Sequence, residues 1–380
     1  MTLCIEVRHR LGSFLLDARF ETSGGLVAVF GRSGAGKTSL INVIAGLIWP
    51  DEGRVTIDGI DLVDTSRGIL VPRHRRRIGY VFQEGRLFPH LTVRQNLLYG
   101  RWFAPHPHTH GDLNRVVAML GLGHVLERRP GRLSGGEKQR VAIGRALRAS
   151  PRLLLMDEPL ASLDEARKAE ILPYIERLRD EAQVPVVYVS HSVAEVARLA
   201  STVVLMSEGK VVACGPAREV MHRLDLLPLV GGAEAGAIVE VTIERHDERF
   251  GLTELRSAAG VWRLPRLPAP LGTRLRLRVR ARDVMIAMSP PADVSALNVL
   301  PGLVADIGAG EGPLAEVRLD CNGEVLLASL TRYSIERLGL AKGVPVFALV
   351  KSIALDRHAL GGTAGAEAGD EAEAFSLHRP

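Results

Sequence analysis

The sequence predicts a layered α/β domain over roughly its first 230 residues, followed by all-β structure. Two observations predict this arrangement. Short β-branched runs alternate with longer helical patterns in the first part, which is typical of strands covered by helices. From about Gly231 the pattern changes to short strand-like pieces broken by Gly and Pro, such as IVEVTIE and the alternating RLRLRVR. These pieces indicate one or two small β-barrels.

The elements of the α/β part follow a clear order along the chain. Three apolar runs are interpreted as buried strands: LVAVF at 26–30, LLLM at 153–156 and PVVYVS at 185–190. A helical pattern begins near Lys37, directly after the Gly-rich turn that ends the first strand. The second strand ends at Asp157 and the third at His191, and TVVLM-SEGK-VVACG then predicts a β-hairpin.

Composition excludes several classes of protein. The 380 residues are 46% apolar and 24% charged, which rules out a wholly disordered chain, a collagen and a coiled coil. The formal net charge of +5 is too small to indicate nucleic-acid binding. Cys4, Cys214 and Cys321 are far apart and form no CxxC pair, so we expect neither a disulfide framework nor a zinc site, and expect a reducing cytosol. No run of about 18 apolar residues occurs, so any membrane role must come through a partner.

One basic run, Arg73-His-Arg-Arg-Arg77, stands ahead of the strand-like IGYVFQ. Such a run could contact nucleic acid or anionic lipid. We expect the simpler alternative, a solvated loop.

Residues 31–38, GRSGAGKT, fit the pattern G-x-x-x-x-G-K-[ST] between a predicted strand and a predicted helix. Small residues there let successive backbone N–H groups wrap phosphate oxygens, and the helix N-terminus adds positive partial charge. The pattern predicts a nucleotide site at Gly31, Arg32, Ser33, Gly34, Ala35, Gly36, Lys37 and Thr38. Lys37 would reach the β- and γ-phosphates, and Thr38 would offer an oxygen to Mg²⁺.

An acidic pair at the end of the second strand supplies the other half of such a site. Asp157 can hold Mg²⁺ there, directly or through water. Glu158 beside it could polarise the attacking water as a general base, a role worth about 10²–10⁴-fold in rate. Acidic pairs at strand ends are common, but this one follows a phosphate-binding loop.

At LSGGEKQR, residues 133–140, the sequence resembles the signature of ABC-type ATPases, and the other motifs stand in that family's order. Gln83 resembles the Q-loop glutamine, SLD at 162–164 the D-loop, and His191 the switch histidine. The resemblance covers residues 1 to about 230 and implies an α/β P-loop NTPase fold with a helical subdomain at about 87–150.

The resemblance also implies roles for individual residues. Two copies pair head to tail in that family, so that Ser134, Gly135 and Gly136 of one copy close on the γ-phosphate held by the other. Asp164 joins the ATP-binding set. Gln83 joins Thr38 and Asp157 at Mg²⁺, and Gln83, Glu158 and His191 form the catalytic set.

The residue that stacks on adenine is left open. Members of the family often place an aromatic residue in the loop after the first strand. Here Leu11 is near the expected place and Phe14 comes slightly late. Phe14 could stack on the base or pack in the domain core.

The C-terminal part resembles the Mop domain, a small oligonucleotide-binding-like barrel that binds molybdate or tungstate. The matching residues are SALNVLPGLV at 295–304, Gly323, ASLT at 328–331, Ser334, LGL at 338–340, Gly343 and VKS at 350–352. Hydroxyls, backbone N–H groups and a cation can hold an oxyanion. The resemblance therefore implies a site at Ser295, Asn298, Lys351 and Ser352. Leu297 stands where the family has Arg, so a regulatory or dimerising barrel without ligand is the alternative.

Together these matches divide the chain into four parts. We expect an ABC ATP-binding domain at 1–232, a β-rich linker or regulatory segment at 233–292, a Mop-like barrel at 293–357 and a disordered tail at 358–380.

The whole chain resembles the ATP-binding subunits of bacterial molybdate importers. The resemblance implies a homodimer on two transmembrane permease subunits, at the cytoplasmic face of the inner membrane. A periplasmic molybdate-binding protein supplies the ion, and nucleic acid plays no part. Leu87 and Phe88 would anchor a permease helix or belong to the core. The alternatives are an importer ATPase for sulfate, tungstate or a sugar, and a non-transport ATPase that senses oxyanions.

Overall fold

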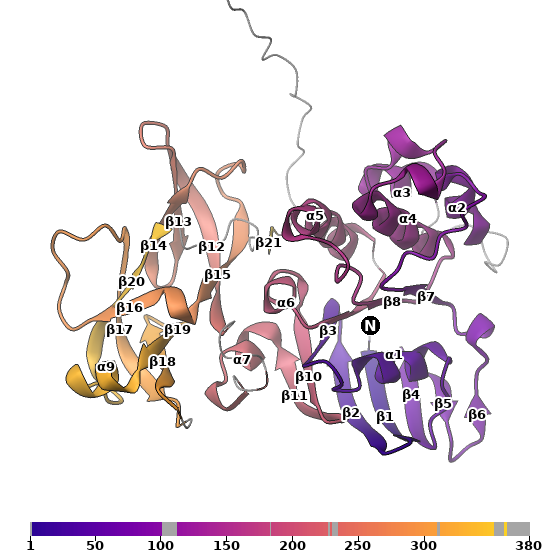
Figure 1. Cartoon of the computed structure of the whole chain (residues 1–380), viewed down its shortest axis with the longest axis horizontal. Helices are drawn as coiled ribbons and strands as arrows, with labels where there is room; N and C mark the ends of the chain where they lie inside the picture. Colours follow the sequence, from indigo (N-terminus) through magenta and orange to yellow (C-terminus); the bar gives the residue numbers. More distant parts are fainter. Residues whose placement is uncertain are drawn as a thin grey trace, which may run out of the picture.

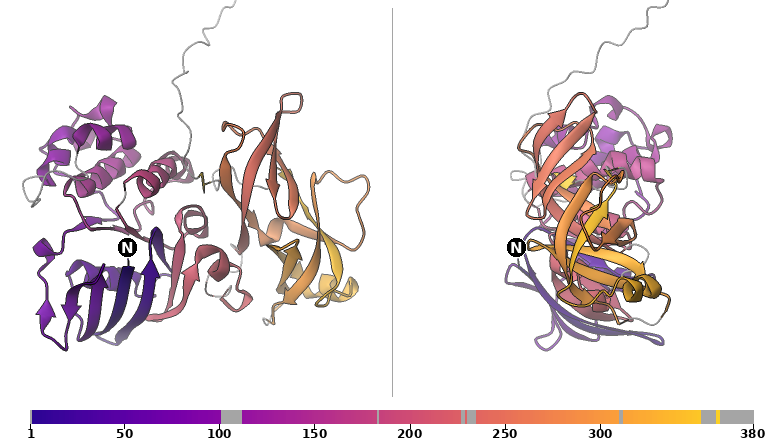
Figure 2. Two further views of the ribbon diagram at one scale, coloured as in Figure 1. Left: turned by 180° about the vertical axis from the view of Figure 1, so that it is seen from behind. Right: turned by 90° about the vertical axis from the view of Figure 1, so that its left-hand side faces the viewer.

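The computed structural model describes residues 2–100, 112–182, 184–226, 229, 235–309, 312–352 and 361–362. Within these residues an α/β part and an all-β part lie side by side (Figures 1 and 2). No helix in the described part is long and apolar enough to cross a membrane. The predicted fold class, an α/β domain with a helical subdomain followed by a small all-β domain, is confirmed.

The α/β part is built on one eleven-stranded sheet with the order β6-β5-β4-β1-β2-β11-β10-β3-β9-β8-β7. Its antiparallel half comprises β1 (Thr2–Leu11), β2 (Phe14–Ser23), β4 (Glu52–Ile57), β5 (Ile60–Asp64) and β6 (Ile69–Leu70). The other half comprises β3 (Leu26–Phe30), β7 (Ile78–Val81), β8 (Leu153–Asp157), β9 (Val186–Ser190), β10 (Thr202–Ser207) and β11 (Lys210–Pro216). Strands β10, β3, β9, β8 and β7 are mutually parallel, so their carboxyl ends share one edge.

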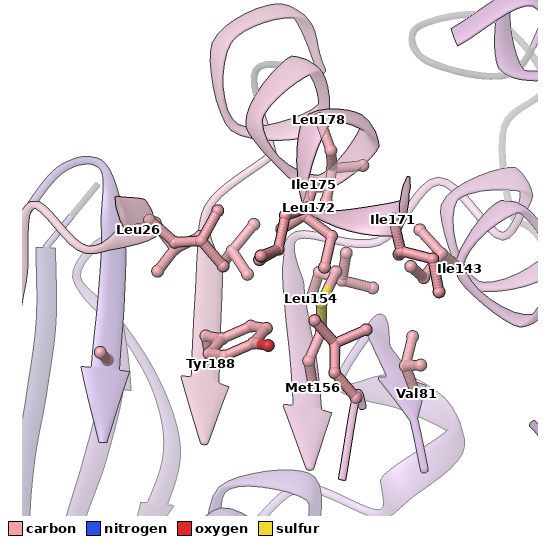
Figure 3. Packing of buried hydrophobic residues seen from close by; sticks show 14 of the residues in the cluster. Leu26, Val81, Ile143, Leu154, Met156, Ile171, Leu172, Ile175, Leu178 and Tyr188 are labelled. Atoms are coloured by element: carbon pink, nitrogen blue, oxygen red, sulfur yellow. The ribbon is translucent and has the colours of Figure 1, made fainter. Parts of the chain in front are cut away.

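Helices cover both faces of the parallel strands, which is why these strands are continuous apolar runs. In β3, Leu26, Ala28 and Phe30 enter one hydrophobic cluster, while Val27 and Val29 enter the other. The first cluster lies under α5 (Glu165–Glu181), and Figure 3 shows its leucines and isoleucines above Tyr188 and Met156. The second cluster is closed by α1 (Lys37–Ala45).

The predicted helical insertion contains α2 (Val93–Tyr99), α3 (Leu113–Met119) and α4 (Gly135–Arg148). A side chain caps each N-terminus: Thr92 for α2, Asp112 for α3 and Ser134 for α4. These caps satisfy backbone N–H groups that the helix itself leaves unpaired.

Two five-stranded sheets form the all-β part. One has the order β14-β13-β12-β15-β21, from β12 (Gly236–Asp247), β13 (Leu252–Ser257), β14 (Gly260–Pro265), β15 (Arg274–Arg280) and β21 (Gly361–Gly362). The other has the order β16-β20-β17-β18-β19, from β16 (Val284–Ala287), β17 (Asn298–Ile307), β18 (Leu314–Cys321), β19 (Glu324–Thr331) and β20 (Pro345–Val350). The short helix α9 (Arg332–Arg337) follows β19.

The expected boundary at residues 292 and 293 does not separate two units in the structure. Strand β16, from the segment expected to be a linker, pairs with β20 of the following barrel. One hydrophobic cluster also joins the two sheets, with Trp262 of β14 and Leu300 of β17 both fully buried in it. In the expected tail, Gly361–Gly362 pairs with β15, and residues 363–380 lie outside the described part.

Polar contacts between described residues join the all-β part to the α/β part, among them the following three. Arg218, on α7 (Ala217–Met221), forms an ion pair with Glu324 of β19. The backbone N–H of Ile238 donates to Nε2 of His222 at 3.2 Å. Burial, together with the nearby arginines Arg218 and Arg318, lowers the pKa of His222 to about 4. The imidazole is therefore neutral at physiological pH, as an acceptor must be.

The third contact lies at the C-terminus of a helix of the α/β part. Arg276 of β15 donates from a guanidinium nitrogen to the carbonyl oxygen of Ala200 at 2.8 Å. Ala200 is the C-cap of α6 (Val193–Leu199), so the cation lies at the negative end of that helix.

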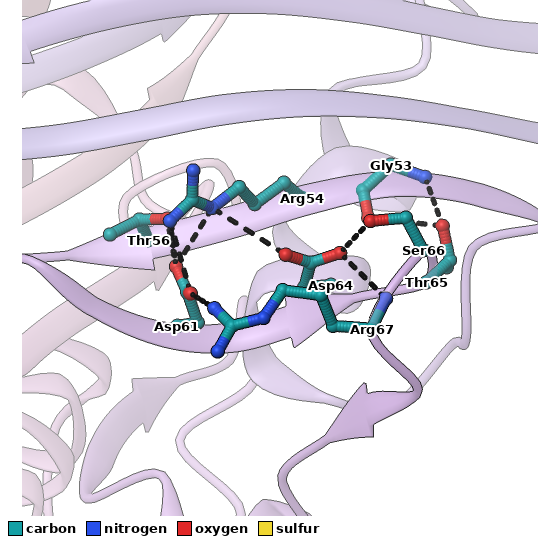
Figure 4. A network of polar contacts seen from close by, with 8 residues as sticks. All are labelled: Gly53, Arg54, Thr56, Asp61, Asp64, Thr65, Ser66 and Arg67. Atoms are coloured by element: carbon teal, nitrogen blue, oxygen red, sulfur yellow. Dashed lines mark hydrogen bonds and ion pairs between the residues drawn. The ribbon is translucent and has the colours of Figure 1, made fainter.

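At the outer edge of the large sheet, a polar network ties the hairpin of β4 and β5 together (Figure 4). The Arg54 guanidinium donates to the Asp61 carboxylate at 2.8 and 3.0 Å, and Thr56 Oγ1 donates to the same group at 2.8 Å. Hydrogen bonds from Thr56 and Arg54 hold the pKa of Asp61 below its ordinary value. The network holds β4 and β5 together.

The basic run at 73–77 is not simply a solvated loop, because one of its members is buried. Arg76 is 1% exposed and donates to the carbonyls of Val43 and Ile44, both at 2.8 Å, and to that of Val71 at 2.8 Å. Its guanidinium also lies 5.1 Å from the centre of the Trp49 ring. Burial lowers the pKa of Arg76 to about 10, so it stays charged at neutral pH and stabilises the C-terminus of α1.

We therefore expect Arg76→Met to lower the free energy of unfolding by about 2–3 kcal/mol, because three carbonyls lose a charged donor. In thermal unfolding of the full chain this should lower the melting midpoint of the α/β part by roughly 5–10 °C. The control is Arg75→Met, since Arg75 is exposed, and it should change stability by no more than about 0.5 kcal/mol. Equal effects of the two substitutions would contradict the capping role.

Candidate functional site

The phosphate-binding pattern forms the turn between β3 and α1, as predicted. Gly31 has φ 152°, and a Cβ atom there would lie 2.3 Å from the carbonyl oxygen of Met206, so only glycine fits. Lys37 is 5% exposed, and its Nζ donates to the carbonyls of Gly31 at 2.9 Å and Arg32 at 3.0 Å. The ammonium group is thus held inside the turn, 3.7 Å from Glu158 Oε1.

A cavity of about 360 Å³ opens over this turn. Its lining residues are Leu11, Phe14, Ser33, Gly34, Gly36, Lys37, Thr38, Ser39 and Glu158. Both residues considered for adenine stacking therefore reach the cavity. Phe14 also packs against the second hydrophobic cluster, and a Cβ atom on Gly36 would lie 2.9 Å from its ring. The ring thus serves the core on one side and borders the cavity on the other.

Oxygen donors suited to Mg²⁺ gather beside the turn. Thr38 Oγ1 donates to Asp157 Oδ1 at 3.2 Å, and the Tyr80 hydroxyl contacts Asp157 Oδ2 at 3.2 Å and Asn42 Oδ1 at 3.1 Å. Burial raises the pKa of Asp157, hydrogen bonds from Tyr80 and Thr38 partly oppose this, and the Glu158 charge adds to it. Burial and the Glu158 charge thus disfavour the charged form of Asp157, and a bound cation would offset this. The hydroxyl and carboxylate oxygens here therefore fit Mg²⁺.

Glu158 and His191 meet at the same edge. Nδ1 of His191 lies 3.1 Å from Glu158 Oε2, and the Glu158 backbone N–H donates to the Val189 carbonyl at 3.1 Å. Glu158 has φ 44°, a left-handed conformation that costs a residue with a side chain about 1 kcal/mol or more. The turn that carries Glu158 is therefore held in place by its neighbours.

The signature segment forms the start of α4. Ser134 Oγ accepts from the Glu137 backbone N–H at 3.2 Å, and the Ser134 backbone N–H donates to Glu137 Oε2 at 2.7 Å. This reciprocal cap leaves the Ser134 hydroxyl hydrogen available to an outside acceptor. Gly135 and Gly136 begin the helix itself. No signature residue lines the cavity over the phosphate-binding turn.

Asp164 is exposed and caps α5 by accepting from the Arg167 backbone N–H at 2.9 Å. Helices α4 and α5 pack together through Ile143 and Ile171, as Figure 3 shows. The signature and D-loop segments are thus parts of one packed unit.

Gln83 is exposed and lies two residues after the end of β7, which pairs with β8, the strand that ends at Asp157. The segment after Gln83 is shaped by a residue that the sequence reasoning missed, the fully buried Asn96 of α2. Asn96 Oδ1 accepts from the Phe88 backbone N–H at 2.9 Å, and its Nδ2 donates to the carbonyls of Phe88, Leu91 and Thr92 at 3.0–3.3 Å. The sequence signal for this role is a single Asn among the apolar residues that face the core in VRQNLLY.

The two apolar residues of this segment are each partly buried. Leu87 packs against the first hydrophobic cluster. The Phe88 ring lies 4.2 Å from that of Tyr99, between ring centres. Tyr80, the hydroxyl beside Asp157, was also missed, and nothing in the run IGYV distinguishes it from a core aromatic.

The four residues expected to hold an oxyanion have different environments. Ser295 and Lys351 are exposed, as is the unusual Leu297. Ser352 is buried, and its Oγ has no hydrogen-bond partner among the residues that the structure describes. Asn298 is fully buried, and its amide accepts from the Arg263 backbone N–H at 2.6 Å and donates to the carbonyls of Arg263 and Val350. Because both amide hydrogens of Asn298 are used, this side chain fastens β14 to β17 and β20 and has no hydrogen left for an oxyanion.

Both parts of the chain are similar to known protein families. The family described as ABC transporter matches residues 20–161, and the TOBE domain family matches residues 294–355. A molybdenum import ATP-binding protein ModC of Mesorhizobium japonicum is 60% identical, over 94% of this chain and 96% of that protein. The protein of the same name from Rhizobium etli is 54% identical, over 94% of this chain and 100% of that protein.

Among solved structures, cbiO1 of Clostridium perfringens, part of the ABC transporter complex cbiONQ, has a TM-score of 0.51 and 26% identity. The match covers 60% of this chain and 92% of that one. Its extent agrees with an α/β nucleotide-binding part followed by a further all-β part. Given the identity to its relatives and the near-complete coverage, the chain is an ABC-type ATPase and belongs to the ABC transporter family, in the group of these ModC relatives.

Proposed function

We propose that this ATPase powers the import of molybdate through partner transmembrane subunits. The supporting observation at the site is that Lys37, Thr38, Asp157, Glu158 and His191 come together at the carboxyl edge of one sheet. The support for the cargo is the 60% identity to a molybdenum import ATP-binding protein over nearly the whole chain.

In the proposed mechanism the backbone N–H groups of residues 31–38 and the Lys37 ammonium bind the phosphates. Thr38 and Asp157, with Gln83, would hold Mg²⁺, which supplies positive charge to the β- and γ-phosphate oxygens. Glu158 accepts a proton from water as the water oxygen bonds to the γ-phosphorus and the bond to the bridging oxygen of ADP breaks. His191, within 3.1 Å of Glu158, orients that carboxylate.

A second copy of the chain would complete each site. In the single chain the signature residues do not line the cavity over the phosphate-binding turn. The Ser134 hydroxyl keeps a hydrogen to donate, and it stands at the positive end of α4. We propose a head-to-tail homodimer in which Ser134, Gly135 and Gly136 of one copy, with Asp164 nearby, close on the γ-phosphate bound by the other.

The chain would be held at the cytoplasmic face of the membrane by two permease subunits, supplied by a periplasmic molybdate-binding protein. The segment shaped by Asn96, with Leu87 and Phe88, is the proposed docking surface for a permease helix. It directly follows Gln83, so a permease helix bound there would lie one short segment from the proposed Mg²⁺ site.

The all-β part would sense the transported oxyanion. Ser352 supports this proposal with a buried hydroxyl that has no partner among the described residues, and Lys351 beside it and Ser295 supply a cation and a second hydroxyl. Leu297 cannot supply the guanidinium of related barrels, so we expect weak binding of molybdate or tungstate at this site.

The experiment that tests the function is ATP hydrolysis by the chain reconstituted with its permease and binding protein in vesicles. We expect molybdate or tungstate in the vesicle compartment that faces the binding protein to raise the rate, and sulfate or a sugar to leave it unchanged. A response to sulfate or sugar alone would assign another cargo. No co-purification with a permease would favour the non-transport alternative.

We expect Glu158→Gln to lower kcat by about 10²–10⁴-fold, because an amide cannot accept the proton from water. ATP should still bind, since the phosphate-binding turn is unchanged, and the nucleotide should remain trapped as ATP. Steady-state hydrolysis and nucleotide retention on the purified chain measure both effects. The matched control is Glu165→Gln, an exposed position on α5, which should hydrolyse ATP at the normal rate. Brisk hydrolysis by Glu158→Gln would remove Glu158 from the mechanism.

Ser134→Asp separates the helix cap from the proposed phosphate contact. Aspartate is as good an N-cap as serine, so the melting midpoint should change little. Its negative charge would repel the γ-phosphate of the other copy, and we expect ATP-dependent dimerisation and hydrolysis to fall at least tenfold. Size-exclusion chromatography with ATP reports the dimer. Thr331→Asp, the same change at the cap of α9, is the control and should dimerise normally.

A further inference from the structure

The loop that carries His191 is tied to the following helix through one buried carboxylate. On one side of His191, Ser190 Oγ donates to Glu195 Oε2 at 2.7 Å. On the other side, the Ser192 backbone N–H donates to Ser190 Oγ at 3.0 Å, and Ser192 Oγ accepts from the Glu195 backbone N–H at 3.4 Å. The Glu195 carboxylate therefore fixes Ser190 directly and Ser192 through the Ser190 hydroxyl, although the His191 side chain itself is exposed.

Glu195 has further partners in two neighbouring elements. The hydroxyl of Tyr188, on β9, donates to Glu195 Oε2 at 2.9 Å. Nζ of Lys168, on α5, lies 3.7 Å from Glu195 Oε1. Tyr188 is fully buried, and burial followed by the Glu195 charge raises the pKa of its hydroxyl well above the ordinary value, so it remains a donor.

A carboxylate that is 5% exposed is costly unless its oxygens are well paired. Glu195 meets this condition with two hydroxyl donors and one ammonium group. Two of these partners, Ser190 and Tyr188, belong to β9 at the point where it leads into His191. The hydrogen bonds of the Glu195 carboxylate therefore go to the end of β9, which leads into the loop that positions the His191 imidazole.

We propose that Glu195 is a positioning residue for ATP hydrolysis, holding Ser190 and Ser192 so that the His191 imidazole meets the Glu158 carboxylate. The inference rests on the proposed roles of Glu158 and His191. Glu195 is 5% exposed and does not line the cavity over the phosphate-binding turn, so it would act only through His191.

The competing view is that Glu195 merely stabilises the packing of α6 on α5. Another pair on these helices does that: Arg198 of α6 makes two 2.9 Å bonds to Glu176 of α5, and both residues are buried. This pair does not contact the His191 loop. Glu176→Gln is therefore the matched structural control, because it disturbs the same helix interface without touching Ser190 or Ser192.

The test measures kcat and KM for ATP on the purified full chain. Glu195→Ala should lower kcat by about 10- to 100-fold, the size expected from misplacing a catalytic group, and should leave the KM for ATP within about threefold. Glu195→Gln should recover most of the rate, because its carbonyl oxygen can still accept from Ser190 and Tyr188. Glu176→Gln should lower the melting midpoint and leave kcat unchanged.

A double-mutant cycle then separates positioning from stability. In the His191→Ala background, Glu195→Ala should lower kcat by less than about twofold further, since there is no imidazole left to position. An equal loss with and without His191 would make Glu195 structural and overturn the proposal. If Glu195→Ala does not fold, Ser190→Ala breaks the same link and should give the same loss and the same lack of additivity, and a full rate in Ser190→Ala would contradict the inference.

The single variants distinguish failure of this inference from failure of the proposed mechanism. If His191→Ala keeps the normal kcat, the proposed role of His191 fails and the role of Glu195 fails with it. If His191→Ala is slow but Glu195→Ala is normal, the mechanism stands and only the positioning role is lost.

Discussion

The parallel pairing of β3, β9 and β8 is the constraint on which the rest of this site depends. Their registers align Phe30 with Ser190 and Asp157 with Val189, so three chain segments far apart in sequence leave the sheet at one edge. The phosphate-binding turn, the acidic pair and the loop that carries His191 each begin where one of these strands ends. If one of these strands shifted by one residue along the sheet, Lys37 would move relative to Glu158 by about 3.3 Å. That movement is enough to break their 3.7 Å contact.

Holding these groups together is energetically unfavourable, and packing of the surrounding core compensates for it. Asp157 is partly buried beside Glu158, and Glu158 is in a left-handed conformation. Such features persist only where neighbouring structure determines them. Here the determining structure is a pair of apolar clusters on the two faces of β3, and buried polar groups such as Arg76 and Glu195 that fasten the ends of helices and loops.

Local chemistry explains why much of the site could be predicted from the sequence. Residues 31–38 match a pattern with fixed spacing, and the pair at 157–158 ends an apolar run downstream of that pattern, so both could be picked out from the sequence. Arg76, Asn96 and Glu195 could not be found in this way, because spacing does not show that a single polar side chain is buried or which carbonyls and hydroxyls it bonds. The same is true of Asn298, whose polar amide suggested a ligand and is used instead by three backbone groups.

In the all-β part, the sequence indicates the strands but not how they pair across the expected domain boundary. Its strands could be recognised by alternation, but the pairing of β16 with β20 crosses the boundary that the sequence suggested. That pairing joins the two sheets into one core, and Arg276 then extends from it to the carbonyl of Ala200. Helix α6 therefore has Glu195 and the loop that carries His191 at its beginning, and a contact from the all-β part at its end. Because a helix of two turns is stiff, the position of the all-β part and the position of His191 are constrained by the same short element.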